Sequence, residues 1–441
     1  MSKLNPVTTH REFSGLPGTI AITFGLAGVI LAFGFLINET YCIDGVNIQW
    51  DEVWKQVPLS KEDIIELFFD KTTWVAYLIW FSILAVLDII LPGKEMKGIT
   101  LRDGTQLDYK INGWPMIMLL LTILTSRLAI SSDYYLPELA FLYNNHLKLT
   151  GTTIAFSFIL ATLVYIASFI PLRGKNGMGT KERILSINGN TGSPFYDWFI
   201  GRELNPRIGY LDIKLFCELR PGLLLWFLIN LSCIHHQYHK LGFVSDSLIL
   251  VNVLQAFYIV DGVQNEEGVL SMIDITTDGF GYMLCFGDLA WLPISYCLQA
   301  RYLLIKPLNL GITNCLLVNG VMALGFYIFH LANQQKSDFK QGKLDHLNLK
   351  LIKTKTGSKL LCDGWWGLSQ HINYLGDWFI GWSWCLTTGF ETPLTYFYVI
   401  YFGSLLFHRQ TRDEMKCRAK YGSTWEEYER KVPYKIIPYI Y

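Results

Sequence analysis

Residues 405–441 read LLFHRQTRDEMKCRAKYGSTWEEYERKVPYKIIPYIY, so a charged and aromatic segment follows directly on an apolar one. The charged run carries Arg409, Asp413, Lys416 and Lys420 at offsets of four, three and four residues. Residues at this spacing share one face of an α-helix, so we expect a helix that sets one acid among three bases.

The end of this helix is also marked in the sequence. Gly422 is expected to stop it, because glycine readily adopts the backbone conformation of a helix C-terminus. Ser423 and Glu426 have the spacing of a capping box, which predicts a second short helix that Pro433 ends. Lysines and arginines beside a membrane often serve only as a topology signal. Such a signal does not require the interleaved acid, cysteine and aromatic residues, so we interpret this segment as a charged cap over a ligand site.

The composition is that of a membrane protein. Of the 441 residues, 51% are hydrophobic and 15% aromatic, while only 17% are charged, against about a quarter in soluble proteins. The formal net charge is +0, which gives no electrostatic case for nucleic-acid binding. The nine cysteines are scattered, several of them within apolar runs. This pattern favours buried free thiols over disulfides or zinc ligands.

Apolar segments long enough to cross a bilayer recur along the whole chain. We therefore expect an all-α integral membrane protein of about ten transmembrane helices, with a cytosol-facing cofactor pocket in its C-terminal half. The expected spans are 16–37, 73–91, 114–130, 149–171, 221–236, 244–261, 281–298, 310–332, 375–390 and 393–408.

Loop charge predicts the orientation of these spans. The loop at 334–360 carries seven lysines against two aspartates, whereas 38–72 carries eight acidic residues against three lysines. The loops at 92–113 and 172–183 are also basic. The positive-inside rule therefore places the three basic loops and both termini in the cytoplasm. Residues 1–15 are read as a short cytosolic N-terminus that leads into a retained span.

A polar stripe runs along the span at 244–261. It consists of side chains three residues apart, followed by an acidic pair: Asn252, Gln255, Tyr258, Asp261, Glu266 and Glu267. Polar groups are costly in lipid, so the stripe must face other helices or a water-filled cavity. Hydrogen bonding between helices is one reading. A functional lining is the other, and we favour it because a tyrosine and several carboxylates converge there.

Common cofactor and metal motifs are missing from the sequence. No GxGxxG follows a strand, and neither GxxxxGK[ST] nor HExxH occurs, so no metal site is predicted. No Gly-x-Ser-x-Gly elbow is present either.

Four longer strings resemble the sterol reductase family. They are GSPFYDWFIGRELNPR (192–207), QAFYIVDGVQNEEGVL (255–270), DGWWGLSQHINYLGDW (363–378) and LLFHRQTRDEMKCRAKYG (405–422). The first and the last look like the two signatures of the family, and the likeness covers nearly the whole chain. Within the family, the chain is most similar to the fungal reductases of the sterol delta-14 double bond in ergosterol synthesis.

The resemblance implies a single sterol-reductase domain over 1–441, multi-pass in the endoplasmic reticulum membrane, with most NADPH contacts in 334–441. It also implies a sterol substrate drawn from the bilayer, contact with membrane lipid, and other sterol-biosynthesis enzymes as partners. The implied cofactor residues are Lys336, Lys340, Leu361, Trp366, Asn373, Tyr374, Arg409, Asp413, Cys417, Arg418, Ala419, Lys420, Tyr421 and Tyr428. The chain has lysine at 340 where the family pattern has arginine, so a bidentate phosphate contact is lost there.

The chemistry implied by the resemblance is reduction of a ring double bond, with a proton added to carbon 15 and a hydride added to carbon 14. Protonation of an olefin requires a positioned acid in a dry site. We expect Tyr258 to supply this proton, assisted by Asp413 and the Glu266–Glu267 pair.

Several alternatives remain open at this stage. Residue types alone do not distinguish delta-14 reduction from delta-7 or delta-24(28) reduction. The C-terminal segment also resembles the isoprenylcysteine methyltransferases, although those chains are shorter and lack the 192–207 string. The lamin B receptor carries a related membrane part, but it has a long basic domain before its first span.

Overall fold

The computed structural model describes residues 4–37, 50–58, 60–173, 180–355 and 357–441. Contacts divide the chain into two compact units. The first unit consists of Met1–Val244 and Gln255–Lys306, and the second of Ser245–Leu254 and Pro307–Tyr441. The boundary falls within a single helix, α11, which spans Asp246–Gln264.

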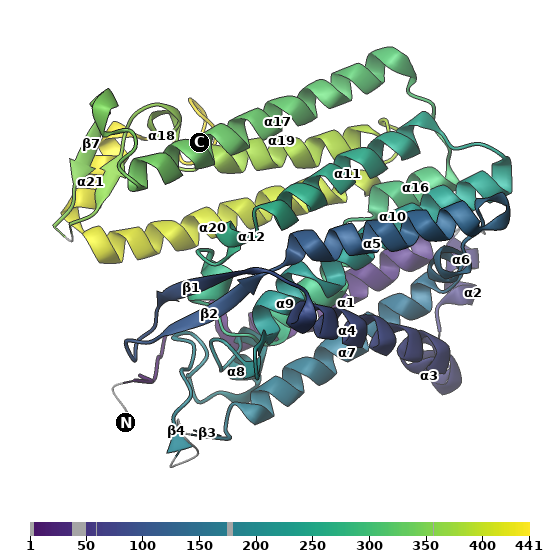
Figure 1. Ribbon diagram of the computed structural model, residues 1–441, viewed down its shortest axis with the longest axis horizontal. Coiled ribbons are helices and arrows are strands. Elements are labelled where there is room, and N and C mark those ends of the chain that lie inside the picture. The colour runs from purple at the N-terminus through teal and green to yellow at the C-terminus, as the bar shows by residue number, and fades with distance from the viewer. Residues whose placement is uncertain (1–3, 38–49, 59, 174–179, 356) are drawn as a thin grey trace. The chain divides into compact units, whose positions relative to one another are not determined.

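The first unit is a helical bundle with small hairpins at its polar end (Figure 1). Its longer helices are α1 (Gly15–Leu36), α3 (Lys61–Phe69), α4 (Lys71–Ile90), α5 (Gly113–Ile130), α7 (His146–Ala167) and α10 (Pro221–Leu241). Shorter helices connect them: α2 (Trp50–Gln56), η1 (Ser132–Tyr134), α6 (Pro137–Asn144), α8 (Pro194–Ile200), α9 (Ile213–Leu219), α12 (Glu266–Val269) and α13 (Ile273–Thr276). The unit closes with four short helical segments in succession, α14 (Tyr282–Phe286), the π-helix η3 (Gly287–Trp291), α15 (Leu292–Ser295) and α16 (Leu298–Ile305).

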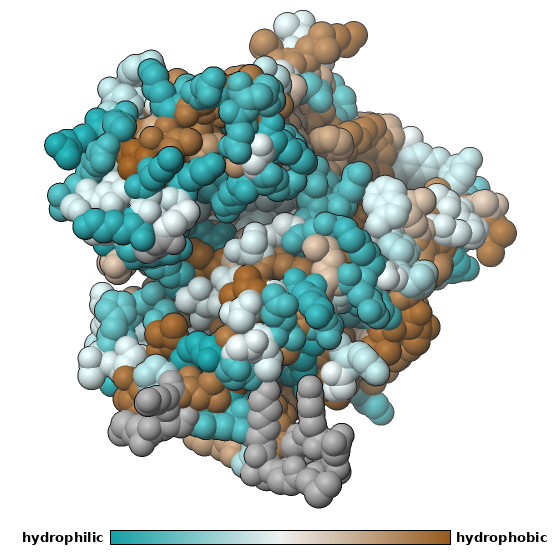
Figure 2. All heavy atoms as spheres, turned by 60° about the vertical axis from the view of Figure 1, so that its left-hand side comes forward, coloured by the Kyte–Doolittle hydropathy of each residue, from teal (hydrophilic) through white to brown (hydrophobic). Residues whose placement is uncertain are grey.

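The second unit is built on three long helices. They are α17 (Gly311–Lys340), α19 (Ile372–Leu386) and α20 (Phe397–Tyr421). Smaller elements complete it: η4 (Asp345–Leu347), β7 (Leu351–Lys353), β8 (Lys359–Leu361), α18 (Trp365–Leu368), η5 (Leu394–Tyr396) and α21 (Ser423–Lys431). Hydrophilic residues cover the end of this unit that carries β7 and α21 (Figure 2).

Seven helical stretches among the described residues are long and apolar enough to cross a membrane. They are Gly15–Leu36, Lys61–Ile90, Gly113–Ile130, His146–Ala167, Ile213–Leu241, Asp246–Gln264 and Gly311–Lys340. This supports a multi-pass membrane protein. The other three expected spans look different, because 281–298 is divided into short helices, α19 has only 15 residues, and α20 continues into the charged segment. The count of ten therefore stays a prediction.

The expectation of a purely helical fold is wrong in one respect. Among the described residues four two-stranded antiparallel pairs occur, and three of them lie in the basic loops. The hairpins are β1–β2 (Lys94–Thr100 and Gln106–Ile111), β3–β4 (Leu172–Arg173 and Thr180–Lys181), β5–β6 (Arg207–Ile208 and Leu211–Asp212) and β7–β8. The turn of the first contains Gly104 at φ +78°, a conformation that Asp-Gly sequences favour.

The expectation of free cysteines is confirmed for the eight that the structure describes. All eight are free, and Cys217, Cys233, Cys285, Cys297 and Cys385 are buried. Cys315 is only half-buried, contrary to the expectation that it lies within the core.

Candidate functional site

A close crossing of α17 and α19 forms the frame of the site. A Cβ added to Gly376 would lie 2.6 Å from the backbone nitrogen of Phe329 and 2.8 Å from the oxygen of Gly325. Real side chains do not approach this closely, so both glycines are required for the helices to touch. One or two turns further along, Asn373 Nδ2 donates to Asn333 Oδ1 over 3.2 Å.

The paired tryptophans are held by the last turns of α17. Gly364 has φ +59°, and a Cβ there would overlap the side chain of Gln335. The Oε1 atom of Gln335 accepts a hydrogen bond of 2.9 Å from the backbone of Trp365. The indole of Trp366 donates to the oxygen of Ala332 over 2.8 Å and is 3% exposed. Trp366 is therefore held firmly against the last turns of α17.

Two lysines lie one helical turn apart near the end of α17, Lys336 and Lys340. The ammonium of Lys336 is 3.9 Å from the centre of the Trp366 ring, a cation–π contact. Lys340 is exposed, and no carboxylate of the described residues pairs with either lysine. Leu361 packs beneath them against Phe339 and Trp366. Lys336 thus covers one face of the indole.

The charged helix is present as predicted, but the way in which it joins the following short helix differs from the prediction. Helix α20 runs to Tyr421, and Gly422 ends it with φ +53°. The expected capping box is wrong, because Gly422 itself is the N-cap of α21 and no side chain caps that helix. Ser423 is already helical, since the turn at glycine lets the two helices follow without a linker.

Aromatic residues join α20 and α21 to the β7–β8 hairpin. Tyr428 and Trp425 are buried, with ring centres 4.8 Å apart, and they pack with Ile352. Cys417 and Tyr421 cover this cluster. Burial, reinforced by Asp413, raises the pKa of Cys417 to about 12, so its thiol stays protonated. Burial likewise raises the pKa of Tyr428.

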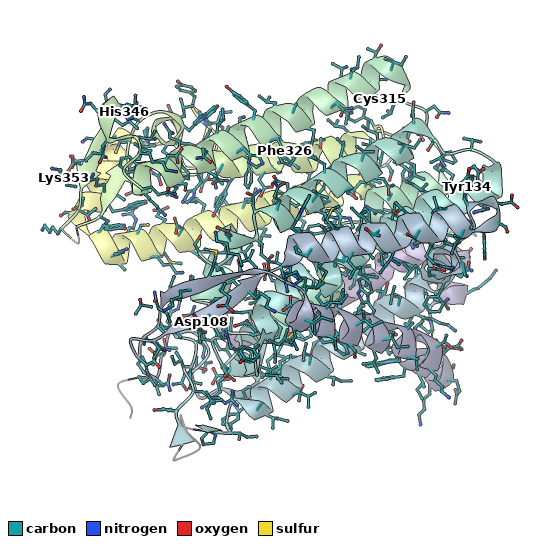
Figure 3. All side chains as sticks on the ribbon, viewed as in Figure 1. Asp108, Tyr134, Cys315, Phe326, His346 and Lys353 are labelled. Atoms are coloured by element: carbon teal, nitrogen blue, oxygen red, sulfur yellow. The ribbon has the colours of Figure 1, made fainter. Side chains whose placement is uncertain are left out.

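The basic residues of α20 are largely engaged with neighbours. Arg418 contacts Glu414 at 3.0 Å and Glu429 at 2.7 Å, and Lys420 lies over the ring of Tyr421 at 5.0 Å. Ala419 is exposed beside them, and Arg409 is half-buried on the preceding turns. Figure 3 shows the polar side chains gathering at this end of the unit, around His346 and Lys353, with Phe326 and Cys315 further along α17.

The structure adds His371, which the sequence interpretation missed. His371 is 6% exposed, and its ring stacks on Tyr374 with centres 4.8 Å apart and planes 16° apart. Its Nε2 atom lies 3.7 Å from Oδ2 of Asp413. Burial lowers the pKa of His371 to about 4, and Lys336 adds to this lowering while Asp413 opposes it. No short-range spacing links His371 to Asp413, so only the fold could reveal the pair.

The chain after α21 is attached to the segment that carries His371. The backbone nitrogens of Gln370 and His371 donate to the oxygens of Tyr434 and Lys435 over 2.9 and 2.8 Å. The side chain of Lys435 pairs with Glu414 on α20. Interactions with Lys435, Gln410 and Arg418 outweigh burial and lower the pKa of Glu414 to about 2.

The expected proton donors lie in the first unit, apart from Asp413. Tyr258 is half-buried, and its ring centre is 6.4 Å from that of Trp226. Glu266 is fully buried and binds Arg220 at 2.5 Å and the backbone of Gly113 at 2.7 Å. Glu267 points elsewhere, to the exposed Lys94 at 2.7 Å. The two glutamates are thus neighbours in sequence but not a pair in space.

Part of the polar stripe serves helix packing. Gln255 Oε1 accepts hydrogen bonds from Trp226 and Asn230 of α10, over 3.1 and 2.6 Å. Asn252 donates to the oxygen of Leu248 in its own helix. The hydrogen bonding between helices is thus observed for Gln255, whereas Asn252 bonds within α11 itself.

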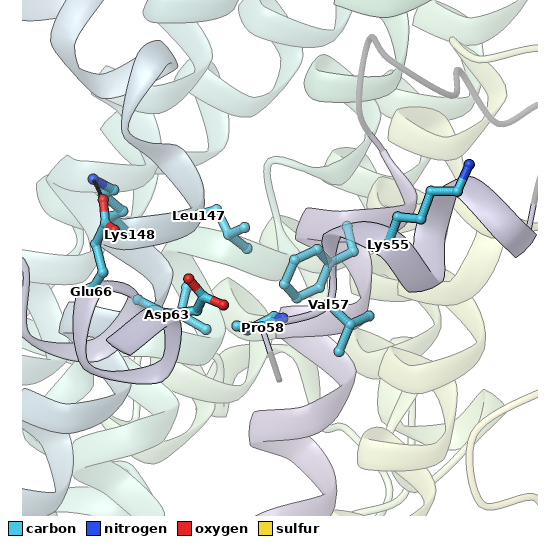
Figure 4. Close-up of a pocket in the computed structure, with 9 residues that line it drawn as sticks. Lys55, Val57, Pro58, Asp63, Glu66, Leu147 and Lys148 are labelled. Carbon is cyan, nitrogen blue, oxygen red and sulfur yellow. Dashed lines mark hydrogen bonds and ion pairs between the residues drawn. The ribbon is translucent and has the colours of Figure 1, made fainter. Parts of the chain in front are cut away.

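One small pocket lies in the first unit and contains none of the expected site residues (Figure 4). It has a volume of about 290 Å³, and Lys148 and Glu66 form an ion pair of 2.6 Å in its wall. Its lining mixes both charges with apolar residues: Phe35, Lys55, Val57, Pro58, Asp63, Glu66, Leu67, Leu147 and Lys148. It therefore lacks the excess of positive charge that a nucleotide phosphate requires.

The family follows from comparison with known proteins. The model of the ergosterol biosynthesis ERG4/ERG24 family matches residues 7–441. The chain belongs to this family. It is 66% identical over 447 residues to the Delta(14)-sterol reductase ERG24 of Candida albicans, covering 100% of this chain and 99% of the relative. It is 57% identical over 444 residues to the enzyme of the same name from Saccharomyces cerevisiae, covering 100% of both.

A more distant relative agrees with this assignment. The Delta(14)-sterol reductase erg24 of Schizosaccharomyces pombe is 44% identical over 440 residues, covering 98% of this chain and 97% of the relative. The expected membership of the sterol reductases is thus confirmed. Because the chain belongs to this family, the alternative that it is an isoprenylcysteine methyltransferase is no longer needed.

Proposed function

We propose that this chain reduces the delta-14 double bond of a sterol intermediate of the 4,4-dimethyl-8,14,24-triene type in ergosterol biosynthesis, with NADPH as the hydride donor. A proton is added to carbon 15 and a hydride to carbon 14, so the carbon–carbon double bond becomes a single bond. Support for the substrate comes from the full-length relatives that carry the name Delta(14)-sterol reductase.

The main support for the cofactor assignment is the pair of lysines at the end of α17 in the second unit. No ion pair ties Lys336 or Lys340 to a carboxylate in the part of the chain that the structure describes, although Asp413 lies near enough to Lys336 to act on its charge, and two such lysines suit a phosphate. Asn373 Oδ1 is buried without a hydrogen-bond partner among the described residues, and such an atom fits an amino or amide group of a ligand. These residues, with Tyr374 and Asp413, would hold NADPH, which supplies the hydride when bound.

For the proton we propose Tyr258, with Asp413 in support. Glu266 and Glu267 rank behind them, because each carboxylate already binds a basic side chain. An ionised, paired carboxylate is a weak proton donor. Tyr258 lies on a long apolar helix, α11, where its hydroxyl can be kept away from bulk water.

The membrane setting follows from the same assignment. We propose that the whole chain acts as one sterol-reductase domain of ten spans in the endoplasmic reticulum membrane, and that the sterol enters from the bilayer. The basic loops then face the cytosol, on the side from which NADPH would reach Lys336 and Lys340.

Expression in a fungal strain that lacks its own delta-14 reductase tests this proposal. The chain should remove the accumulated delta-14 sterol from the sterol profile. With purified protein, NADPH and separate delta-14, delta-7 and delta-24(28) sterols, only the first should be reduced. Reduction of either of the other sterols instead would refute the assignment of the bond.

A further inference from the structure

We propose that His371 is a positioning residue of the cofactor site, which holds the carboxylate of Asp413 through its Nε2 atom while its ring stacks on Tyr374. This rests on the proposed function, because Asp413 and Tyr374 are there assigned to the nucleotide site. His371 itself is not among the residues that the family resemblance implied.

The backbone fixes His371 from two directions. The residue is the N-cap of α19, and its own nitrogen donates to Lys435 over 2.8 Å. The neighbouring Gln370 binds the same C-terminal segment twice, through its backbone to Tyr434 and through Nε2 to Val432, each at 2.9 Å. Such attachment leaves the imidazole little freedom, as a positioning role requires.

The ring is placed between an aromatic face and a carboxylate. The stacking on Tyr374 sets the ring plane, and the Nε2 edge then points to Asp413 at 3.7 Å. This distance is longer than a hydrogen bond. Contacts of this kind are often long in a free enzyme and tighten in the complex. A shift of about half an ångström would form the hydrogen bond.

Burial keeps the ring neutral, while the charges around it act in both directions. The groups that face it are Lys336 from α17, Asp413 and Glu414 from α20, and Lys435 from the C-terminal segment. Because burial lowers the pKa of His371 to about 4, the imidazole is uncharged at neutral pH. A neutral N–H donor orients the Asp413 carboxylate without cancelling its charge, so the carboxylate remains available to a ligand or a proton.

Two substitutions separate the two functions of the ring. His371→Phe keeps an aromatic face for Tyr374 but removes the nitrogen that faces Asp413. His371→Gln places an amide nitrogen close to the Nε2 position but removes the ring. His346→Phe is the matched control, because His346 is exposed in the same unit (Figure 3).

With the full chain in detergent, His371→Phe should lower kcat/KM roughly ten- to hundredfold, the usual effect of losing a hydrogen bond to a charged group. His371→Gln should recover at least a third of that loss on a logarithmic scale, and His346→Phe should equal the wild type. A wild-type rate for His371→Phe would overturn the inference. So would equal losses in the Phe and Gln variants, since these would show that the nitrogen is not what matters.

A double-mutant cycle with Asp413→Asn provides the decisive test. If His371 acts through Asp413, the double variant should be no slower than Asp413→Asn alone, whereas independent roles would multiply the two losses. The same cycle is measured on the thermal midpoint of the nucleotide-free protein. Coupling there supports the His371–Asp413 contact even if the sterol or cofactor assignment fails, and the absence of coupling in both measurements refutes the inference.

Discussion

Two clusters of charge in this molecule, one in each unit, are built in opposite ways. In the first unit, Arg220 is 2% exposed and binds Asp88, Asn112 and Glu266, which belong to α4, the start of α5, and α12. In the second unit, Lys336 and Lys340 lie side by side with no carboxylate partner among the described residues. Like charges one turn apart repel each other, and the nearby Asp413 offsets this repulsion only in part at Lys336, so a bound anion would stabilise the second cluster further.

The difference separates charges used for folding from charges reserved for a ligand. The Arg220 cluster ties helix ends together through Nε and Nη2 of the guanidinium, each bound to a neighbouring side chain. In the lysine pair, Lys336 instead rests on the face of Trp366, and neither lysine forms an ion pair with a carboxylate of the described residues. Substituting a residue of the paired cluster should therefore lower the stability of the fold. Substituting the unpaired lysines should instead weaken the binding of the ligand.

The largest expected effect is at Arg220. Arg220→Ala leaves Glu266 buried without its cation, and removing one partner of a buried pair costs about 3–5 kcal/mol. We expect little folded protein and a strongly lowered thermal midpoint. The control is Lys94→Ala, whose partner Glu267 is 46% exposed, where the cost should be at most about 1 kcal/mol. Similar losses in both variants would break the comparison.

The next effect concerns turnover at Tyr258. Tyr258→Phe removes only the hydroxyl, so we expect turnover to fall by roughly a hundredfold with NADPH binding unchanged. Single-turnover reduction and a nucleotide titration measure the two separately. Tyr327→Phe is a suitable control, because Tyr327 is 58% exposed on α17. Full-rate reduction by Tyr258→Phe would move the search for the proton donor to Asp413.

The lysine pair should show the reverse of the Arg220 result. The double substitution Lys336→Ala and Lys340→Ala should leave the thermal midpoint close to that of the wild type. It should raise the KM for NADPH roughly tenfold or more, since each phosphate contact is charge-assisted. The KM for NADH should change far less. Equal changes for both nucleotides would mean that the lysines do not read the 2′-phosphate, and Lys353→Ala serves as the exposed control.

The smallest effect is the acid dependence of stability at His371. Its pKa is lowered to about 4 in the folded protein, against about 6.5 when unfolded. The unfolded chain therefore binds the additional proton between these values, and stability falls as the pH drops through this window. Between pH 7 and pH 5 the loss is up to about 2 kcal/mol. His371→Gln should flatten this part of the thermal-midpoint profile, and identical profiles would contradict the lowered pKa.

The sequence predicted features that depend on near neighbours. The helix ending at Gly422 followed from glycine chemistry, and most spans followed from apolar length. The β1–β2 hairpin could also have been predicted, because Asp103-Gly104 between two polar strands is a strong turn signal. It was missed because the loop was read for charge alone.

Features set by tertiary contacts could not be read from the sequence. The capping-box pattern at Ser423 and Glu426 is sound locally, but Gly422 joins the two helices and takes the cap position itself. The contact of Lys336 with the ring of Trp366, thirty residues away, has no signal in the sequence. His371 meets Asp413 only because α19 and α20 pack side by side and the C-terminal segment fixes both.

Helix α17 is in close contact with α19 at Gly325 and Gly376, so a small tilt at this crossing displaces the distant end of α17. From Gly325 to Lys336 the helix rises about 16 Å, so a tilt of about 5° at the crossing would displace the ammonium by about 1.4 Å. A single methyl group at Gly376 would force such a tilt, because it meets backbone atoms that cannot move aside. A substitution at the helix crossing would then impair nucleotide binding at the end of α17 that carries Lys336. In a genetic screen, such a substitution would be indistinguishable from a change in the site itself.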